Sequence, residues 1–112
     1  MTKVLRITRH PVTADQLQEL RRIYGEDVTI TEVSETIRSV GRVVDLVREH
    51  GADVLEAVLA FPILSEILCD CDLLDIPVIR AVMNRELNGD DVTFTFSHYE
   101  RLLKIVVETE KL

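Results

Sequence analysis

Hydrophobic and polar residues alternate along the chain in a pattern that predicts a strand followed by a helix, several times over. Residues 4–8 (VLRIT) are a short apolar run typical of a strand. Thr13 then has the position of a helix N-cap, and Gln16, three residues later, completes a capping box. Apolar residues at helical spacing follow as far as Gly25, where we expect the helix to end.

The next two units follow the same order. Residues 28–33 are rich in β-branched residues and predict a strand, and residues 35–49 have the apolar spacing of a helix that Gly51 ends. Residues 54–61 form a nearly continuous apolar run, which indicates a strand covered on both faces. Pro62 favours the first position of a helix, so we expect the third helix to begin there.

The last third of the chain predicts two strands and a final helix. Residues 76–83 indicate a fourth strand, residues 84–91 are polar and contain an Asn-Gly turn signal, and residues 92–96 alternate as a fifth strand. Ser97 and Glu100 have the spacing of a second capping box. The helix expected after them has an apolar face made of Leu102, Leu103, Ile105 and Val106.

This alternation predicts a Rossmann-like α/β fold, with three layers and a mainly parallel sheet of four to five strands between the helices. A flavodoxin-like strand order, 2-1-3-4, places the first and third strands side by side. With 112 residues, the chain is expected to form one domain.

Composition and charge exclude several classes of protein. The chain is 46% hydrophobic, which argues against disorder, and its net charge of −7 leaves no broad basic surface for long nucleic acid. With 4% aromatic residues and no Trp, a base-stacking surface is not expected. A compact anion held by a few local cations stays compatible, because such binding depends on the local field. No apolar stretch approaches the roughly 18 residues of a membrane span, and no signal peptide precedes the first strand, so we expect a cytoplasmic protein without a membrane partner.

Motifs of several enzyme families are missing. No GxGxxG, GxxxxGK[ST] or GxSxG occurs, which disfavours dinucleotide, P-loop and esterase chemistry. The acidic residues that a receiver domain needs at the ends of its first and third strands are also missing. No His, Asp or Glu cluster has the spacing of metal ligands, so any catalysis is expected to need neither metal nor cofactor. Cys69 and Cys71 are expected to be reduced and to lie at the end of the third helix.

The end of the first strand holds the main candidate site. In α/β sheets, ligands bind beyond the carboxyl ends of the strands, and a helix N-terminus attracts anions. Arg9 can bind a phosphate, His10 can transfer a proton near neutral pH, and Thr8 offers a hydroxyl. Thr13 and Gln16 are weaker ligand-binding candidates, because helix capping already explains them. The alternative is an ordinary surface loop before a capped helix.

Other polar residues have two interpretations each. Ser65 and Glu66, near the start of the third helix with Phe61 and Pro62, would face the same crevice as the first strand, or are only polar residues of a first helical turn. His98 either contributes to a site or belongs to the first turn of the last helix.

Two single charges stand inside apolar strands. Glu56 and Arg80 are expected to form an ion pair between neighbouring strands, or one of them faces another subunit, because a lone buried charge is costly.

Two motifs together resemble the small stand-alone ring nucleases of type III CRISPR systems. The first is ITRHP with Thr13 and Gln16 after it, which is similar to a strand that ends in Ser/Thr-(Arg)-His with Pro, followed by Thr-x-x-Gln. The second is AVLAFPILSEIL, which is similar to an apolar strand that runs into Leu-Pro, here with Phe61 in place of leucine. Val12 also departs from the family, since relatives often have glycine there.

The resemblance implies a homodimer, similar to a reduced CARF domain, that binds a cyclic oligoadenylate, with cyclic tetra-adenylate as the expected ring. It implies metal-independent cleavage, in which a ribose 2′-OH attacks the adjacent phosphate and leaves a 2′,3′-cyclic phosphate, and a role in switching off an antiviral signal. The expected catalytic residues are His10, Arg9 and Thr8, and the expected ligand contacts are Thr13, Gln16, Phe61, Pro62, Ser65 and Glu66. The alternatives are a non-catalytic sensor or sponge for the same ligand, and an interaction domain of unrelated role.

Overall fold

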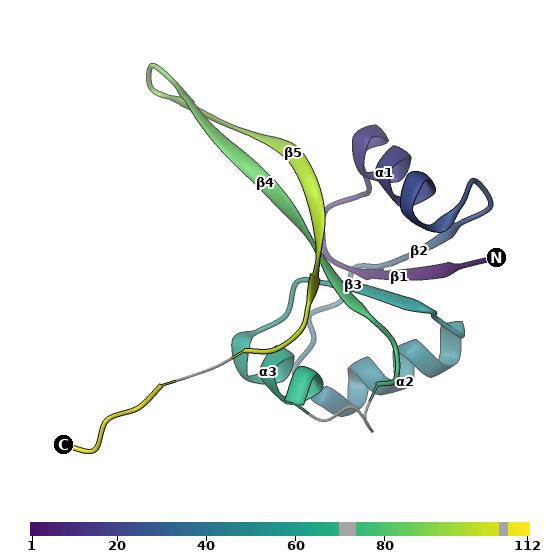
Figure 1. Ribbon diagram of the computed structural model, residues 1–112, viewed down its shortest axis with the longest axis vertical. Coiled ribbons are helices and arrows are strands. Elements are labelled where there is room, and N and C mark those ends of the chain that lie inside the picture. Colours follow the sequence, from purple (N-terminus) through teal and green to yellow (C-terminus); the bar gives the residue numbers. More distant parts are fainter. Residues whose placement is uncertain (70–73, 106–107) are drawn as a thin grey trace.

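The computed structural model describes residues 1–69, 74–105 and 108–112, and it has an α/β architecture (Figure 1). The strands are β1 (Lys3–Ile7), β2 (Thr29–Val33), β3 (Val54–Ala57), β4 (Val78–Asn88) and β5 (Asp91–Leu102), and the helices are α1 (Ala14–Tyr24), α2 (Val40–His50) and α3 (Phe61–Cys69). They form one five-stranded sheet in the order β2-β1-β3-β4-β5. The first four strands are parallel, which confirms the predicted order 2-1-3-4, and β5 pairs with β4 in the antiparallel direction.

The helices cover both faces of the sheet, so the molecule has three layers (Figure 1). On one face, Leu20 of α1 packs with Val4, Val54 and Ile79. On the other face, side chains of α2 and α3 pack against the alternate residues of the same strands, among them Leu5. None of the described helices is long and apolar enough to cross a membrane.

The ends of α1 lie where the sequence predicts them. Thr13 Oγ1 accepts the backbone N–H of Gln16 at 3.2 Å, and Gln16 Oε1 accepts the backbone N–H of Thr13 at 3.1 Å. This reciprocal pair confirms the capping box. Gly25, at φ +107°, ends the helix as predicted.

The second helix begins later than predicted. α2 starts at Val40 rather than at residue 35, because Ser39 caps it: its Oγ accepts the backbone N–H of Arg42 at 3.3 Å. The preceding segment is free of helix and contributes to the site described below. Gly51, in the left-handed region at φ +57°, ends the helix as predicted.

The third strand is shorter than the predicted span 54–61. Its four residues are all buried, as expected for a strand covered on both faces, but Val58 is 79% exposed. The strand ends here because its neighbour β1 ends: the N–H of Val58 bonds to the carbonyl of Ile7, the last residue of β1. α3 then begins at Phe61, one residue before the predicted start. Cys69 ends α3, and the rest of the predicted helix end, residues 70–72, lies outside the described residues.

The predicted C-terminal helix is wrong. β4 extends to Asn88 instead of ending at residue 83, the chain turns at Gly89 as the Asn-Gly signal predicts, and β5 continues to Leu102. Ser97 lies at an irregularity in the strand pairing, and its Oγ is 2.8 Å from Nδ1 of His98 rather than at a helix N-terminus. Pairing with β4 therefore prevails over a local signal of capping type.

The residues expected to form the apolar face of that helix have other positions. Leu102 ends β5 and packs with the α2 and α3 side of the core. Leu103 and Ile105 have no regular secondary structure, and Val106 lies outside the described residues.

Candidate functional site

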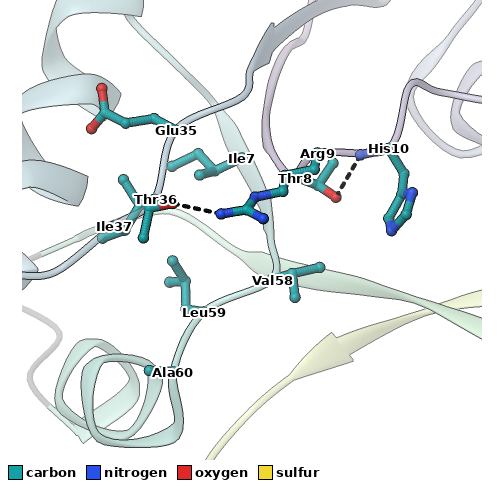
Figure 2. A pocket seen from close by; sticks show the side chains of 10 residues that line it. All are labelled: Ile7, Thr8, Arg9, His10, Glu35, Thr36, Ile37, Val58, Leu59 and Ala60. Carbon is teal, nitrogen blue, oxygen red and sulfur yellow. Dashed lines mark hydrogen bonds between the residues drawn. The ribbon is translucent and has the colours of Figure 1, made fainter.

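The loop after β1 lies at the carboxyl edge of the sheet, between the ends of β2 and β3. Here the chain leaves a cavity of about 320 Å3 (Figure 2). Its walls are Ile7, Thr8, Arg9 and His10 from β1 and the loop, Glu35, Thr36 and Ile37 from the segment before α2, and Val58, Leu59 and Ala60 from the segment before α3. Thr8, Arg9 and His10, the three residues predicted as catalytic, therefore all border this cavity.

Arg9 points across this cavity. Its Nη2 donates a hydrogen bond of 2.8 Å to the hydroxyl of Thr36 (Figure 2). Within the described residues, the Arg9 guanidinium has no ion-pair partner, so its charge is free to meet an anion. A hydroxyl orients the guanidinium without neutralising it, which is the condition for binding a phosphate.

Among the described residues of the cavity wall, Glu35 is the one carboxylate, and it is paired with an arginine. Both oxygens of Glu35 accept hydrogen bonds from Arg42, at 2.7 Å from Nε and 2.9 Å from Nη2. These bonds hold the pKa of Glu35 below its ordinary value, so it stays ionised and paired. Arg42 thereby reduces the repulsion that Glu35 would exert on an anion near Arg9.

The side chains of Thr8 and His10 do not converge on one point. Together they form a ridge at the edge of the cavity. The backbone N–H of His10 donates to Thr8 Oγ1 at 3.3 Å, which leaves the Thr8 hydroxyl hydrogen available for a ligand. The His10 ring lies on the opposite side of the loop from the Arg9 guanidinium (Figure 2). It is exposed, and within the described part of the chain the ring nitrogens have no hydrogen-bond partner.

A second cavity, of about 350 Å3, lies on the other side of this ridge. Thr8, His10 and Val58 line both cavities, and the second cavity is completed by the start of α1 and by β4. Its further walls are Arg6, Pro11, Thr13, Gln16, Glu56, Ala57, Arg80, Ala81 and Met83. A ligand that contacts both Arg9 and the His10 ring must therefore lie across the loop.

Beneath the loop, a buried guanidinium uses all five of its N–H groups. Arg6 is 3% exposed. Its acceptors are Glu56 Oε1 (3.1 Å) and Oε2 (3.2 Å), the His10 carbonyl (3.1 Å), Glu32 Oε1 (3.1 Å) and Gln16 Oε1 (3.3 Å). Arginine has five donors in a planar fork, so this side chain is fully satisfied. Arg6 links two neighbouring strands, α1 and the loop.

Two of these acceptors also hold the loop backbone. Glu32 Oε1 accepts the N–H of Val12 at 2.7 Å, and Gln16 Oε1 accepts the N–H of Thr13 at 3.1 Å. With the His10 carbonyl on Arg6, the backbone between β1 and α1 is fixed at three places. The loop is a preorganised element of the site, which lowers the entropic cost of binding.

Tyr99 completes the network from the edge strand. Its hydroxyl donates to Glu56 Oε1 at 2.9 Å. Burial and the charge of Glu56 raise the pKa of Tyr99 well above its ordinary value. Burial tends to lower the pKa of Arg6, but its hydrogen bonds and charge interaction with Glu56 outweigh this, so the guanidinium stays charged.

The predicted ion pair between Glu56 and Arg80 is wrong. Glu56 lies opposite Arg6 in register with β1, whereas Arg80 on β4 pairs with Glu100 on β5 at 3.5 Å. The two charged residues lie on strands that are neighbours in the sheet, but their side chains belong to different pairs. His98 also contacts Glu100, at 3.1 Å, and lines neither of the two cavities.

The remaining candidates divide between the second cavity and the surface. Thr13 and Gln16 line the second cavity, and both also form the capping box. The residues at the start of α3 line neither cavity, although Ala60, just before the helix, lines the first. Those residues are Phe61, which is 60% exposed, Pro62, Ser65 and Glu66.

Several residues of the site were not singled out from the sequence. Arg6, like Glu56, is a single charge inside an apolar strand, which is a signal that could have identified it. The pairing of β1 with β3 brings the two side chains together. Thr36 and Glu35 lay inside a predicted helix, so their place in the cavity wall had no local signal. Within the described residues, no group of three or more metal-binding side chains is present.

Comparison of the chain with protein-family models, with curated proteins and with solved structures finds no match.

Proposed function

We propose that this chain is a Rossmann-like, CARF-like ring nuclease that binds a cyclic oligoadenylate, with cyclic tetra-adenylate as the ring, and cleaves it without a metal ion. The observation that carries the proposal is the position of Arg9, Thr8 and His10 where two cavities meet, with an Arg9 guanidinium and a His10 ring that have no charged partner among residues 1–69, 74–105 and 108–112. The motifs ITRHP and AVLAFP, which resemble those of ring nucleases, contribute residues to this same edge of the sheet.

The form of the site favours an extended ligand with several phosphates. Arg9 and His10 point to opposite sides of the loop, so a small anion bound at Arg9 does not reach the His10 ring (Figure 2). A ring of several nucleotides spans both cavities and places separate groups on each side of the ridge. The net charge of −7 is compatible with this ligand, because the field at Arg9 is local.

In the proposed reaction, the substrate supplies its own nucleophile. The ribose 2′-oxygen forms a bond to the adjacent phosphorus, the bond from phosphorus to the 5′-oxygen breaks, and a 2′,3′-cyclic phosphate and a 5′-hydroxyl result. His10 takes the proton of the 2′-hydroxyl while water protonates the leaving 5′-oxygen, or it gives a proton to the 5′-oxygen while water accepts that of the 2′-hydroxyl. The Thr8 hydroxyl, on the ridge beside His10, stabilises the charge on the oxygens of the scissile phosphate, and Arg9 holds a neighbouring phosphate of the ring on the other side of the loop. The protein mainly positions the reacting atoms, a task suited to a fixed loop.

A non-catalytic sensor or sponge is the second candidate. The divergence of Arg9 and His10 favours it, because binding through separate phosphates does not need a proton-transferring group beside Arg9 (Figure 2). In either case we propose a cytoplasmic homodimer that lowers the concentration of an antiviral second messenger.

Incubation of the protein with radiolabelled cyclic tetra-adenylate in EDTA tests the proposal. We expect a linear product that ends in a 2′,3′-cyclic phosphate, and loss of cleavage in His10→Ala. His50→Ala is the matched control, because His50 lies exposed in the last turn of α2 and lines neither cavity. A ring that is bound tightly but stays intact for many hours identifies a sensor. A ring that is not bound by the wild-type protein rejects both candidates.

A further inference from the structure

The β4–β5 hairpin extends well beyond the rest of the molecule (Figure 1). Near their tip the two strands pair only with each other, from Met83 opposite Phe96 to Asn88 opposite Asp91. A two-stranded hairpin without further packing is only marginally stable in water. The outer part of this hairpin therefore has no strand or helix packed on it from the described part of the chain.

The outer hairpin has one apolar face. Side chains alternate across a strand, so the cross-strand pairs Met83–Phe96, Arg85–Phe94 and Leu87–Val92 share one face. We call these six residues the apolar hairpin face. Four of its five hydrophobic residues are 41–68% exposed, and all residues of the opposite face are polar. Alternation this regular, with the apolar side uncovered, is typical of an interaction surface.

An acidic groove adjoins the base of this face. A cavity of about 480 Å3 lies between the outer side of α1 and β5, and Phe96 belongs both to its wall and to the apolar hairpin face. Its other lining residues are Asp15, Gln18, Glu19, Arg22, Glu26 and Ser97. Glu19 pairs with Arg22, whereas Asp15 and Glu26 have no ion-pair partner within the described residues. The groove therefore carries excess negative charge.

The opposite charge stands in the middle of the apolar hairpin face. Arg85 is exposed and has no ion-pair partner in the described part of the chain. Its cross-strand neighbour is Phe94, so the guanidinium projects from apolar surroundings. The apolar hairpin face is thus a basic, hydrophobic surface, and the groove beside its base is an acidic one. The two are complementary in charge.

We propose that the apolar hairpin face of one copy of this chain docks in the acidic groove of a second copy, and that the second copy returns the same contact. A two-fold dimer needs a surface that is complementary to itself, and a single chain here carries both halves side by side. Because Phe96 belongs both to the apolar hairpin face and to the acidic groove, the two hairpins lie antiparallel near the two-fold axis. Arg85 of one copy then meets the acidic groove of the other. This inference rests on the homodimer of the proposed function and not on its ligand.

The contact also reaches the candidate site. Met83 belongs to the apolar hairpin face and lines the second cavity, which the His10 ridge borders. Docking of a second hairpin over Met83 covers this side of the cavity. Dimerisation and ligand binding are therefore coupled through Met83.

The proposed interface is tested by substitutions at two adjacent positions, with the dimer dissociation constant of each variant measured by sedimentation equilibrium. Phe94→Glu places a carboxylate on the apolar hairpin face, and Thr95→Glu places the same group one residue along on the polar face. We expect Phe94→Glu to raise the dimer dissociation constant by roughly 10-fold or more, as for the loss of a central interface aromatic. We expect Thr95→Glu to change it by less than about 3-fold, within the range of energetically near-neutral contacts. Circular dichroism of each variant verifies its fold.

A charge exchange keeps the test decisive if Phe94→Glu does not fold. Arg85→Glu should weaken the dimer, and the double variant R85E/E26R should restore it, because Glu26 is a carboxylate of the groove that is unpaired within the described residues and both contacts of a two-fold dimer exchange their charges together. A wild-type protein that is monomeric at all concentrations overturns this proposal and the homodimer of the proposed function. A dimer whose dissociation constant does not change in Phe94→Glu overturns this surface alone. If Phe94→Glu does not fold, an unchanged dissociation constant in Arg85→Glu has the same meaning.

Discussion

The buried guanidinium of Arg6 binds the carbonyl oxygen of the exposed His10 at 3.1 Å. One end of this contact lies in the interior of the sheet, and the other lies in the loop that carries the candidate chemistry. The stability of the fold and the geometry of the site therefore depend on the same side chain.

Arg6→Met should be among the most destabilising single substitutions in the protein. It leaves the buried carboxylate of Glu56 with Tyr99 as its one remaining partner in the network. Removal of one partner of a buried ion pair typically lowers the free energy of unfolding by about 3–5 kcal/mol. Urea unfolding measures the loss. Arg80→Met is the matched control: its pair with Glu100 is exposed, and such pairs contribute less than about 1 kcal/mol.

Replacement of both partners should separate stability from function. In R6M/E56L no buried charge is left alone, and apolar replacements of a buried pair are often neutral or stabilising, so we expect most of the unfolding free energy to return. The His10 carbonyl still lacks its donor, and affinity for cyclic tetra-adenylate should stay low. Binding restored together with stability would contradict a positioning role for Arg6.

The pair of Glu35 and Arg42 should tune the affinity of the first cavity for anions. Arg42→Gln leaves an unpaired carboxylate in the cavity wall, and we expect weaker binding of cyclic tetra-adenylate, by roughly 3- to 10-fold at low salt, with a smaller effect at high salt. Adding Glu35→Gln should reverse the loss. Arg48→Gln removes the same charge from the exposed end of α2 and serves as the control.

Stability should fall at alkaline pH because of Tyr99. Its pKa is raised in the folded protein, so its contribution to stability is complete below the ordinary tyrosine pKa of about 10 and is lost as the pH rises through the folded value. Unfolding between about pH 8 and 11 should show this decline, and Tyr99→Phe should flatten it. Burial also raises the pKa of Tyr24, so Tyr24→Phe completes the comparison, and tyrosinate absorbance follows both.

Two glycines of α2 should respond to alanine in opposite directions. Gly51 has φ +57°, where a side chain is strained, and Gly51→Ala should destabilise the protein by about 1 kcal/mol. Gly41 lies in the first turn of the helix with open space around it, and Gly41→Ala should stabilise by about 0.5–1 kcal/mol. Thermal unfolding of the two variants gives the comparison, and equal signs would contradict it.

Local signals in the sequence were sufficient to find the first four strands, α1 and the loop after β1, and the flavodoxin-like topology then supplied the strand order. Each depends on neighbouring residues, such as the reciprocal bonds of Thr13 and Gln16. The prediction of a C-terminal helix is wrong because the spacing of Ser97 and Glu100 is equally compatible with a strand. Only pairing with β4 decides between helix and strand. The Arg6 network could not be predicted from local sequence either, because its hydrogen bonds to Glu32 and Glu56 join residues 26 and 50 positions apart.

The five satisfied donors of Arg6 also decide how the loop opens. Because Glu32 and Gln16 bind both Arg6 and the loop backbone, the loop cannot fray one residue at a time without uncovering a charge inside the sheet. The amide protons of Val12 and Thr13 should then exchange with solvent at rates near those of global unfolding, although Val12 lies near the surface. The loop that carries the candidate chemistry thus belongs to the same cooperative unit as the sheet.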